Sequence, residues 1–281
     1  MTLPALLPAP ASPVADAYAR LGEAYPGLAF RELGPGDAVP AGEGWFRADE
    51  LAAGGPALDG FLAWDADQIR RDYDEEARPD VVASFGLHRY AWPALLLITV
   101  PWFLRRRVPR VDPAGVAYHR TDRRMVVRVT DFACLPDDPA AVLPGARVVP
   151  DEAALRDEVR TAVADHIGPL LDGFAPRMRR GRRALWGMVT DEVVEGLWYI
   201  GERLGERQRA MTELQELLPG TVKPYVGTPG FRTLPGPSGE RLPTRDRASC
   251  CLFYTLRPDD TCVTCPRTCD ADRVARLLPN A

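Results

Sequence analysis

The sequence contains very little lysine or histidine. Lys223 is the only lysine and there are three histidines among 281 residues, so arginine carries nearly all of the positive charge. Together with the abundance of Ala, Pro and Gly, this bias is typical of GC-rich coding sequence, and a single arginine is weak evidence of function. The formal net charge of −4 gives no overall reason to expect binding to nucleic acid or to an anionic membrane.

Long apolar segments and nucleotide-binding loops are also lacking. The longest apolar run, residues 91–104, holds two prolines and is shorter than the roughly 20 residues that a membrane-spanning helix needs. Three arginines at 105–107 follow it and imitate the flank of a membrane segment. We interpret the run as a buried core helix and predict no transmembrane segment, with peripheral membrane contact as the weaker alternative. No Gly-x-Gly-x-x-Gly follows a predicted strand, so no nicotinamide or flavin site of the usual kind is expected.

The first thirteen residues do not resemble an export signal. They are apolar and rich in proline but have neither a basic start nor a clear cleavage site, and we interpret them as a loose tail. A cytoplasmic location is the resulting expectation. In a reducing cytoplasm, clustered cysteines hold metal more often than they form disulfides.

The apolar periodicity predicts an α+β protein with a predominantly helical body. Helical spacing covers residues 58–76, 151–174 and 183–218. A further helix is expected to begin near Asp80 and to continue, with breaks, into residues 95–104.

One β-hairpin is the clearest strand signal. Residues 116–134 alternate as two strands around a turn at 121–123, which predicts a hairpin-centred antiparallel sheet. Residues 220–243 are rich in Gly and Pro and predict an ordered loop or linker. The chain is therefore expected to divide into an irregular N-terminal region (1–60), a mainly helical body (61–240) and a small C-terminal module (241–281).

Five of the six cysteines lie between Cys250 and Cys269. An adjacent pair, Cys250-Cys251, is separated by ten residues from the step Cys262-x-x-Cys265. Residues 252–256 alternate like a strand and residues 257–260 have turn chemistry. The segment is therefore predicted to double back and bring the second pair of cysteines towards the first.

The spacing alone leaves several kinds of site open. Structural zinc takes four thiolates but usually pairs two Cys-x₂₋₄-Cys steps, and here one step is an adjacent pair. Neighbouring side chains diverge in extended backbone, so one tetrahedral ion would demand a distorted loop. A two-iron cluster offers two metal atoms and is the easier target. Redox-active thiols remain open, whereas a disulfide scaffold conflicts with the expected compartment.

The same residues resemble a known family. Arg247-Ala-Ser-Cys-Cys-Leu-Phe-Tyr254 and Cys262-x-x-Cys265-Pro266 are similar to the terminal signature of the FhuF-like ferric siderophore reductases. The resemblance is sharp over residues 245–266, weaker over 84–110 and 182–218, and absent from the first sixty residues. It implies that a [2Fe-2S] cluster is bound by Cys250, Cys251, Cys262 and Cys265.

The resemblance also implies a function. It suggests a cytoplasmic reductase that takes siderophore-bound Fe(III) to Fe(II) in a one-electron step, with no catalytic residue beyond the cluster ligands. The expected partners are a ferric siderophore, with the hydroxamate type favoured, and an external electron donor such as a ferredoxin or flavodoxin. The alternative is a non-enzymatic zinc- or Fe–S-binding sensor or interaction protein. A siderophore-biosynthesis enzyme would be much longer and would need a nucleotide site that we do not find.

Two groups of arginines are weaker candidates. Arg245, Arg247 and Arg267 flank the cysteines, where cations would raise a cluster's reduction potential, but a solvated surface is the simpler interpretation. A dense patch before the last long helix would suit an acidic electron donor or an acidic siderophore, again with a solvated loop as the simpler interpretation. No aromatic residues interrupt the patch, so nucleic acid is not a predicted partner. The patch consists of Arg177, Arg179, Arg180, Arg182 and Arg183.

The remaining conspicuous side chains are interpreted as structural. They are the isolated histidines His88, His119 and His166; the aromatic residues Trp186, Trp198 and Tyr199 of one apolar helix; Cys134, as a core cysteine; and Cys269, as a buried or helix-capping residue.

Overall fold

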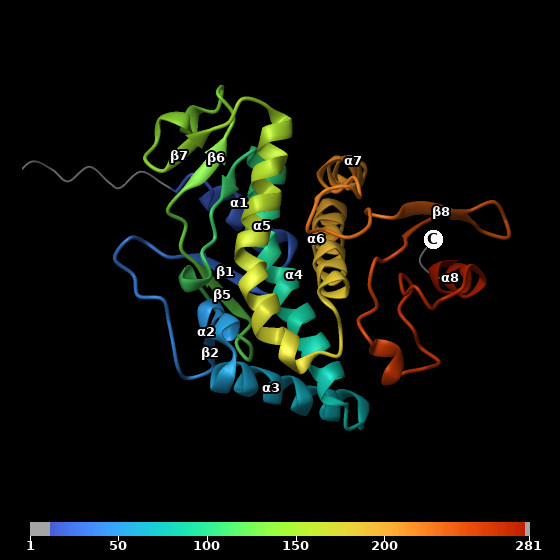
Figure 1. Ribbon diagram of the computed structural model, residues 1–281. Helices are drawn as coiled ribbons and strands as arrows, with labels where there is room; N and C mark the ends of the chain where they lie inside the picture. Colours follow the sequence, from blue (N-terminus) through green and yellow to red (C-terminus); the bar gives the residue numbers. More distant parts are fainter. Residues whose placement is uncertain (1–11, 279–281) are drawn as a thin grey trace, which may run out of the picture.

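One long helix, α4 (Pro79–Arg105), organises the protein, whose computed structural model describes residues 12–278. Figure 1 shows α4 beside α5 (Glu152–Phe174) and α6 (Arg182–Arg203), and most of its residues are buried. Among residues 12–278 it alone is long and apolar enough to cross a membrane, and 83% of its most apolar window is buried inside the protein. The segment predicted as a loose tail lies almost wholly outside the described residues.

The sequence predicts breaks in this helix, but α4 runs without interruption through Pro93 and Pro101. A proline lacks the amide that would bond to the carbonyl four residues earlier, so Pro101 leaves the carbonyl of Leu97 without its helical partner. The hydroxyl of Tyr18, on α1 (Ala15–Ala24), donates a hydrogen bond of 3.0 Å to that carbonyl. A distant side chain therefore compensates for the missing bond.

The other helices follow the sequence pattern with one correction. The helix predicted for 183–218 is two helices, α6 and α7 (Arg207–Leu217), because Gly205 takes a positive φ of 75° and turns the chain back. Gly201 permits the close return, since a Cβ there would lie 2.5 Å from the Cβ of Ala210. The remaining helices are α2 (Ala48–Ala53), α3 (Gly55–Tyr73) and α8 (Asp270–Leu277).

The predicted hairpin forms the centre of a four-stranded sheet. Its strands are β4 (Val116–His119) and β5 (Arg124–Val127), and the strand order is β1-β5-β4-β2. The sheet is mixed rather than antiparallel, because β1 (Ala29–Glu32) pairs with β5 in parallel. A long connection separates these two strands, so no tight turn forces an antiparallel pairing. The edge strand opposite β1 is β2 (Trp45–Arg47), which pairs with β4.

Cys134 lies outside that hairpin. It ends β6 (Phe132–Cys134), which belongs to a second small sheet and is fully buried. The flanking strands of this sheet are β3 (Val108–Pro109) and β7 (Ala146–Val148).

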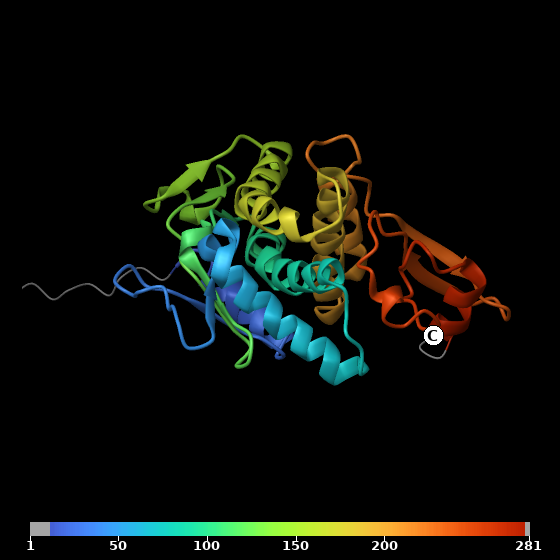
Figure 2. The ribbon, with the colours of Figure 1, turned by 60° about the horizontal axis from the view of Figure 1, so that its bottom comes forward.

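The C-terminal segment forms a lobe against α6 (Figure 2). The stretch predicted as a Gly/Pro-rich loop contains β8 (Phe231–Pro235) and the start of β9 (Arg241–Arg245), which pair as an antiparallel ribbon. Prolines are tolerated because both strands of a two-stranded ribbon are edges. Leu234 and Leu242 face each other in it and are buried.

The first sixty residues contribute to the main core. Val14, Tyr18, Leu28 and Leu51 belong to the same buried cluster as apolar residues of α4, α5 and α6. The division of the chain at residues 60 and 240 stays a prediction.

His166 is a fully buried histidine in this core. Its Nδ1 lies 2.9 Å from the carbonyl of Val111 and its Nε2 lies 2.9 Å from the hydroxyl of Tyr90. A carbonyl only accepts, so Nδ1 carries the proton and Nε2 accepts from the tyrosine. Burial lowers the pKa of His166 to about 4.

This histidine predicts acid sensitivity of the fold. The unfolded chain binds a proton at His166 below the ordinary pKa of 6.5, whereas the folded protein does so only near 4. Stability is therefore lost as the pH falls between these values, by about 2 kcal/mol from pH 7 to pH 5. Urea unfolding at both pH values should show that loss in the parent protein and a smaller one in H166Q. Equal losses in the two proteins would contradict this assignment.

Candidate iron–sulfur site

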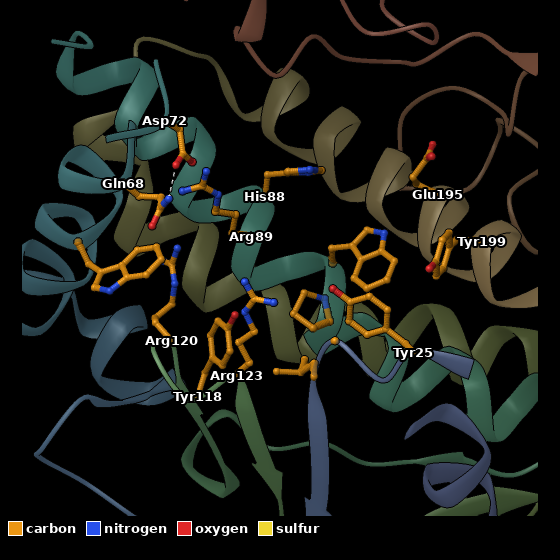
Figure 3. A pocket seen from close by; sticks show the side chains of 15 residues that line it. Tyr25, Gln68, Asp72, His88, Arg89, Tyr118, Arg120, Arg123, Glu195 and Tyr199 are labelled. Atoms are coloured by element: carbon orange, nitrogen blue, oxygen red, sulfur yellow. Dashed lines mark hydrogen bonds between the residues drawn. The ribbon is translucent and has the colours of Figure 1, made fainter. Parts of the chain in front are cut away.

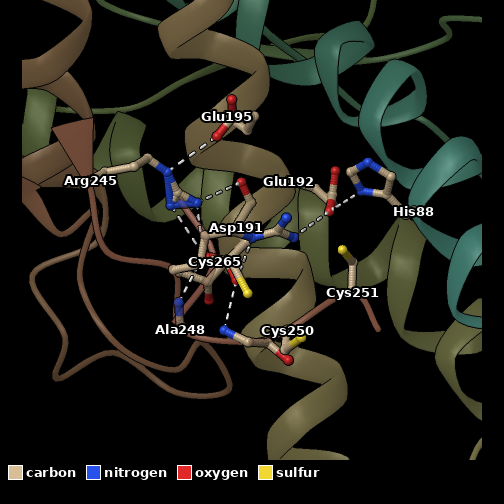
Figure 4. A network of polar contacts seen from close by, with 12 residues as sticks. His88, Asp191, Glu192, Glu195, Arg245, Ala248, Cys250, Cys251 and Cys265 are labelled. Carbon is tan, nitrogen blue, oxygen red and sulfur yellow. Dashed lines mark hydrogen bonds and ion pairs between the residues drawn. The ribbon is translucent and has the colours of Figure 1, made fainter. Parts of the chain in front are cut away.

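The cysteines predicted as ligands lie on the loop between β9 and α8, which packs against α4 and α6 (Figure 4). All are free thiols. Cys265 is buried, and the other three, Cys250, Cys251 and Cys262, are half-buried. The assignment of these residues as ligands stays a prediction.

The thiols approach one another in two pairs. Cys250 interacts with Cys265, and Cys251 interacts with Cys262. Among residues 12–278, no three His, Cys, Asp or Glu side chains surround one point as the ligands of a single ion would. Two pairs of thiolates match a centre with two metal atoms, each of which takes two sulfurs from the protein. The donor set therefore fits a [2Fe-2S] cluster.

The adjacent cysteines are followed by a tight turn rather than the predicted strand. Leu252 takes a left-handed conformation with φ 72°, which costs a non-glycine residue about 1–2 kcal/mol. Its carbonyl accepts hydrogen bonds from both the amide and the hydroxyl of Thr255, which stabilise the turn. A short 3₁₀ helix, Phe253–Thr255, follows. The chain therefore changes direction directly after the adjacent cysteines.

Contacts with α4 hold the same turn in place. The hydroxyl of Ser84 donates a 2.9 Å hydrogen bond to the carbonyl of Cys251. The ring of Phe253 lies between the rings of Tyr73 and Phe85, with centroid distances of 5.7 and 6.3 Å. The turn is therefore anchored to the helical body.

A buried carboxylate on α6, that of Asp191, fixes the chain entering the cysteine motif. Both terminal nitrogens of Arg245 donate to its Oδ1, at 3.1 and 2.7 Å. The amides of Ala248 and Ser249 donate to Oδ1 and Oδ2, at 2.9 and 2.8 Å. Gly187, one turn earlier on α6, leaves room for this segment, since a Cβ there would lie 3.3 Å from the Cβ of Ser249.

The Asp191 ion pair is removed from water. Arg245 is 0% exposed and Asp191 is 1% exposed. Burial raises the pKa of Asp191, and the guanidinium groups of Arg245 and Arg247 together with the two amides oppose that effect. The surface interpretation of Arg245 and Arg247 is therefore wrong. Arg267 is exposed, and its guanidinium lies 4.0 Å from the ring centroid of Tyr254.

A second polar chain connects α4, α6 and the thiols. Nδ1 of His88 lies 2.5 Å from Oε1 of Glu192, and Arg247 lies 3.6 Å from the same oxygen. Burial lowers the pKa of His88, but the charge and hydrogen bond of Glu192 outweigh it and raise that pKa. The sequence does not indicate that His88 lies near the cysteines, because its partner Glu192 is distant in the sequence.

The surroundings act in opposite directions on the thiols: burial raises the pKa of Cys250 and the hydrogen bond with Cys251 raises that of Cys262, whereas the pKa of Cys251 is lowered. The amides of Leu252 and Arg267 each lie 3.4 Å from a sulfur, of Cys250 and Cys265 respectively. The hydrogen bond with Cys262 lowers the pKa of Cys251 to about 5, and the charge of Arg247 acts in the same direction. Amide donors and a nearby cation stabilise thiolate ligands and adjust the reduction potential of a cluster.

Cys269 and the arginine patch were also candidates from the sequence. Cys269 occupies the N-cap position of α8 but is exposed, and its side chain makes no capping hydrogen bond. In the arginine patch, Arg177 pairs with Asp59 and Arg182 pairs with Asp172. Arg180 donates to the hydroxyl of Ser249 at 3.2 Å, so one residue of the patch contacts the cysteine loop directly.

The Asp191 contacts predict a large effect of a single substitution. D191A removes the buried partner of Arg245 and leaves two amides unsatisfied, which should lower the free energy of unfolding by about 3–5 kcal/mol. The control is E195Q, because Glu195 touches the same arginine at 3.3 Å but is 40% exposed. Denaturant unfolding should show a change below about 1 kcal/mol for this variant. Equal losses in both variants would contradict the anchoring role of Asp191.

The ligand assignment predicts a clean division among the cysteines. Each of the single substitutions C250S, C251S, C262S and C265S should abolish or alter the cluster spectrum and lower the iron and sulfide content. C269S is the matched control from the same loop, and C134S is the control from the core; neither should change the cluster. A full and unchanged cluster in C251S would overturn the role of the adjacent pair.

Comparison with known families identifies this region. The family model of the FhuF 2Fe-2S C-terminal domain matches residues 247–267, which include all four predicted ligands. No curated protein matches the chain. The cofactor of this domain is a [2Fe-2S] cluster, as its description states. The resemblance seen in the sequence is thus confirmed over residues 247–267, which match the FhuF 2Fe-2S C-terminal domain.

Proposed function

We propose that the protein is a cytoplasmic ferric siderophore reductase, which delivers one electron to siderophore-bound Fe(III). The observation that carries the proposal is a cavity of about 270 Å³ beside the 2Fe-2S domain. Cys251 and Cys262 line it together with Phe85 and His88 of α4. One sulfur pair therefore faces the helical body rather than being enclosed within its own loop.

The chemistry requires little from the protein beyond placement of the reactants. A [2Fe-2S] cluster supplies a carrier of one electron. The electron converts Fe(III) of the chelate to Fe(II), which hard oxygen donors hold far less tightly, and no covalent bond of the siderophore breaks. The charge of Arg247 stabilises the thiolate of Cys251, and the amide of Leu252 donates to the sulfur of Cys250. Phe85 and Phe253 cover this sulfur pair with apolar surface.

The electron is proposed to arrive from another protein. A small one-electron carrier such as a ferredoxin or flavodoxin matches the single electron that the reaction consumes. The arginine patch at 177–183 remains the proposed docking region for an acidic donor, because Arg179 and Arg183 are exposed there.

The proposal predicts rapid reoxidation of the reduced protein by ferric siderophores. Protein reduced anaerobically by one electron should recover its oxidised visible absorbance in a stopped-flow experiment with hydroxamate, catecholate or citrate-type ferric chelates. Ferrozine should trap one Fe(II) per protein. Gallium(III) complexes of the same chelators cannot be reduced in this way and serve as the control.

A reduced protein that stays reduced with all three kinds of ferric chelate would contradict the reductase function. The iron–sulfur domain would then serve a sensor or an interaction protein.

A further inference from the structure

A second and larger cleft, of about 580 Å³, adjoins the cysteine cavity (Figure 3). Its walls come from α3, α4, α6, the residues after α1, and the β4–β5 hairpin. His88 lines both this cleft and the cavity that contains Cys251 and Cys262. The two spaces thus share a lining residue.

One wall of the cleft is aromatic. Trp92 of α4 meets Tyr25 and Tyr199 edge to face, with ring centroids 4.9 and 5.7 Å apart. Tyr199 is 40% exposed, so its interpretation as a core residue is wrong. Trp186 of the same helix is buried, as expected. An exposed ring that faces a cleft offers a flat apolar surface with a polar edge, which suits a partly aromatic or amphipathic ligand.

The opposite wall has an excess of positive charge. Arg120 is 5% exposed and donates two hydrogen bonds of 2.7 Å to Asp65, which is itself 0% exposed. Arg89 donates to the same carboxylate at 2.6 Å. Two guanidinium groups share one negative charge, so one positive charge is left uncompensated. Arg123, exposed on the hairpin turn, adds another and points into the cleft (Figure 3).

The acidic residues that line the cleft lie at its rim and on the other wall, apart from the arginines. Asp72 lies at the exposed rim and accepts a hydrogen bond from Gln68. Glu195 also touches Arg245, but that guanidinium already pairs with Asp191, so Glu195 brings a negative charge to the other wall. The arginine wall therefore attracts anions, although Asp72 reduces its net charge.

We propose that this cleft binds an oxygen-donor ferric chelate that carries net negative charge, of the catecholate or citrate type. The inference rests on the proposed function and assigns its substrate site. Three hydroxamates neutralise the charge of Fe(III), whereas three catecholates leave a charge of −3, so the arginine wall distinguishes the two classes. The volume lies within the range of small-molecule sites. The site thus departs from the preference for hydroxamates expected from the sequence.

Calorimetric titration with redox-inert gallium(III) complexes tests the site without any electron transfer. The probes are a hexadentate tris-catecholate complex, a citrate-type complex and a neutral tris-hydroxamate complex. The variants are R123Q and, as the matched control, R124Q. Arg124 is the adjacent exposed residue, but it pairs with Asp122 and packs over Trp45, outside this cleft.

Anionic complexes should bind more tightly than the neutral one. R123Q should weaken anionic binding about tenfold and leave the neutral complex unchanged, whereas R124Q should stay within about twofold of the parent protein. Y199A, on the aromatic wall, should weaken all bound complexes. Circular dichroism checks that each variant is folded.

Equal effects of R123Q and R124Q, or tighter binding of the neutral complex, would overturn the site. Fast reduction of ferric chelates together with unchanged binding by R123Q and Y199A would keep the reductase function and reject this cleft. Specific binding that R123Q weakens, without any ferric reduction, would support the cleft and reject the reductase function.

Discussion

The cysteine site depends on one buried carboxylate. Asp191 receives Arg245 and the amides of Ala248 and Ser249, and it thereby fixes the chain directly before Cys250 on the rigid surface of α6. A buried ion pair is not by itself a strong source of stability, because desolvation offsets the attraction. Here the ion pair fixes the position of the loop, since a loop without regular secondary structure needs directional bonds to hold its thiols in place.

The electron-carrying domain is not isolated from the helical body. The cysteine turn bonds to Ser84 and packs against Phe85 on α4, and Arg247 reaches Glu192 on α6. His88 lines both the cavity of this sulfur pair and the large cleft. Helix α4 thus serves three purposes: it forms the centre of the core, supports the cysteine turn and contributes a wall of the cleft.

The sequence predicted features that rest on local patterns. The two hairpin strands, the helix that follows Asp151 and the approach of the second pair of cysteines to the first all have local signals, and each is found, although the hairpin ends at Val127 and not at Cys134. The errors arose where distant residues decide the structure. Tyr18 allows α4 to continue past Pro101, and the β8–β9 ribbon orders a segment rich in Gly and Pro. The roles of Asp191 and His88 are likewise invisible in the sequence, since their partners lie far along the chain.

The central claim is that two pairs of thiolates hold two iron atoms rather than one zinc ion. The most direct test is metal, sulfide and spectral analysis of the full-length protein purified without oxygen. The account predicts a red-brown protein with two irons and two sulfides per chain, no stoichiometric zinc, and a cluster that accepts one electron in a reductive titration. A colourless protein with one zinc ion and no acid-labile sulfide would contradict it.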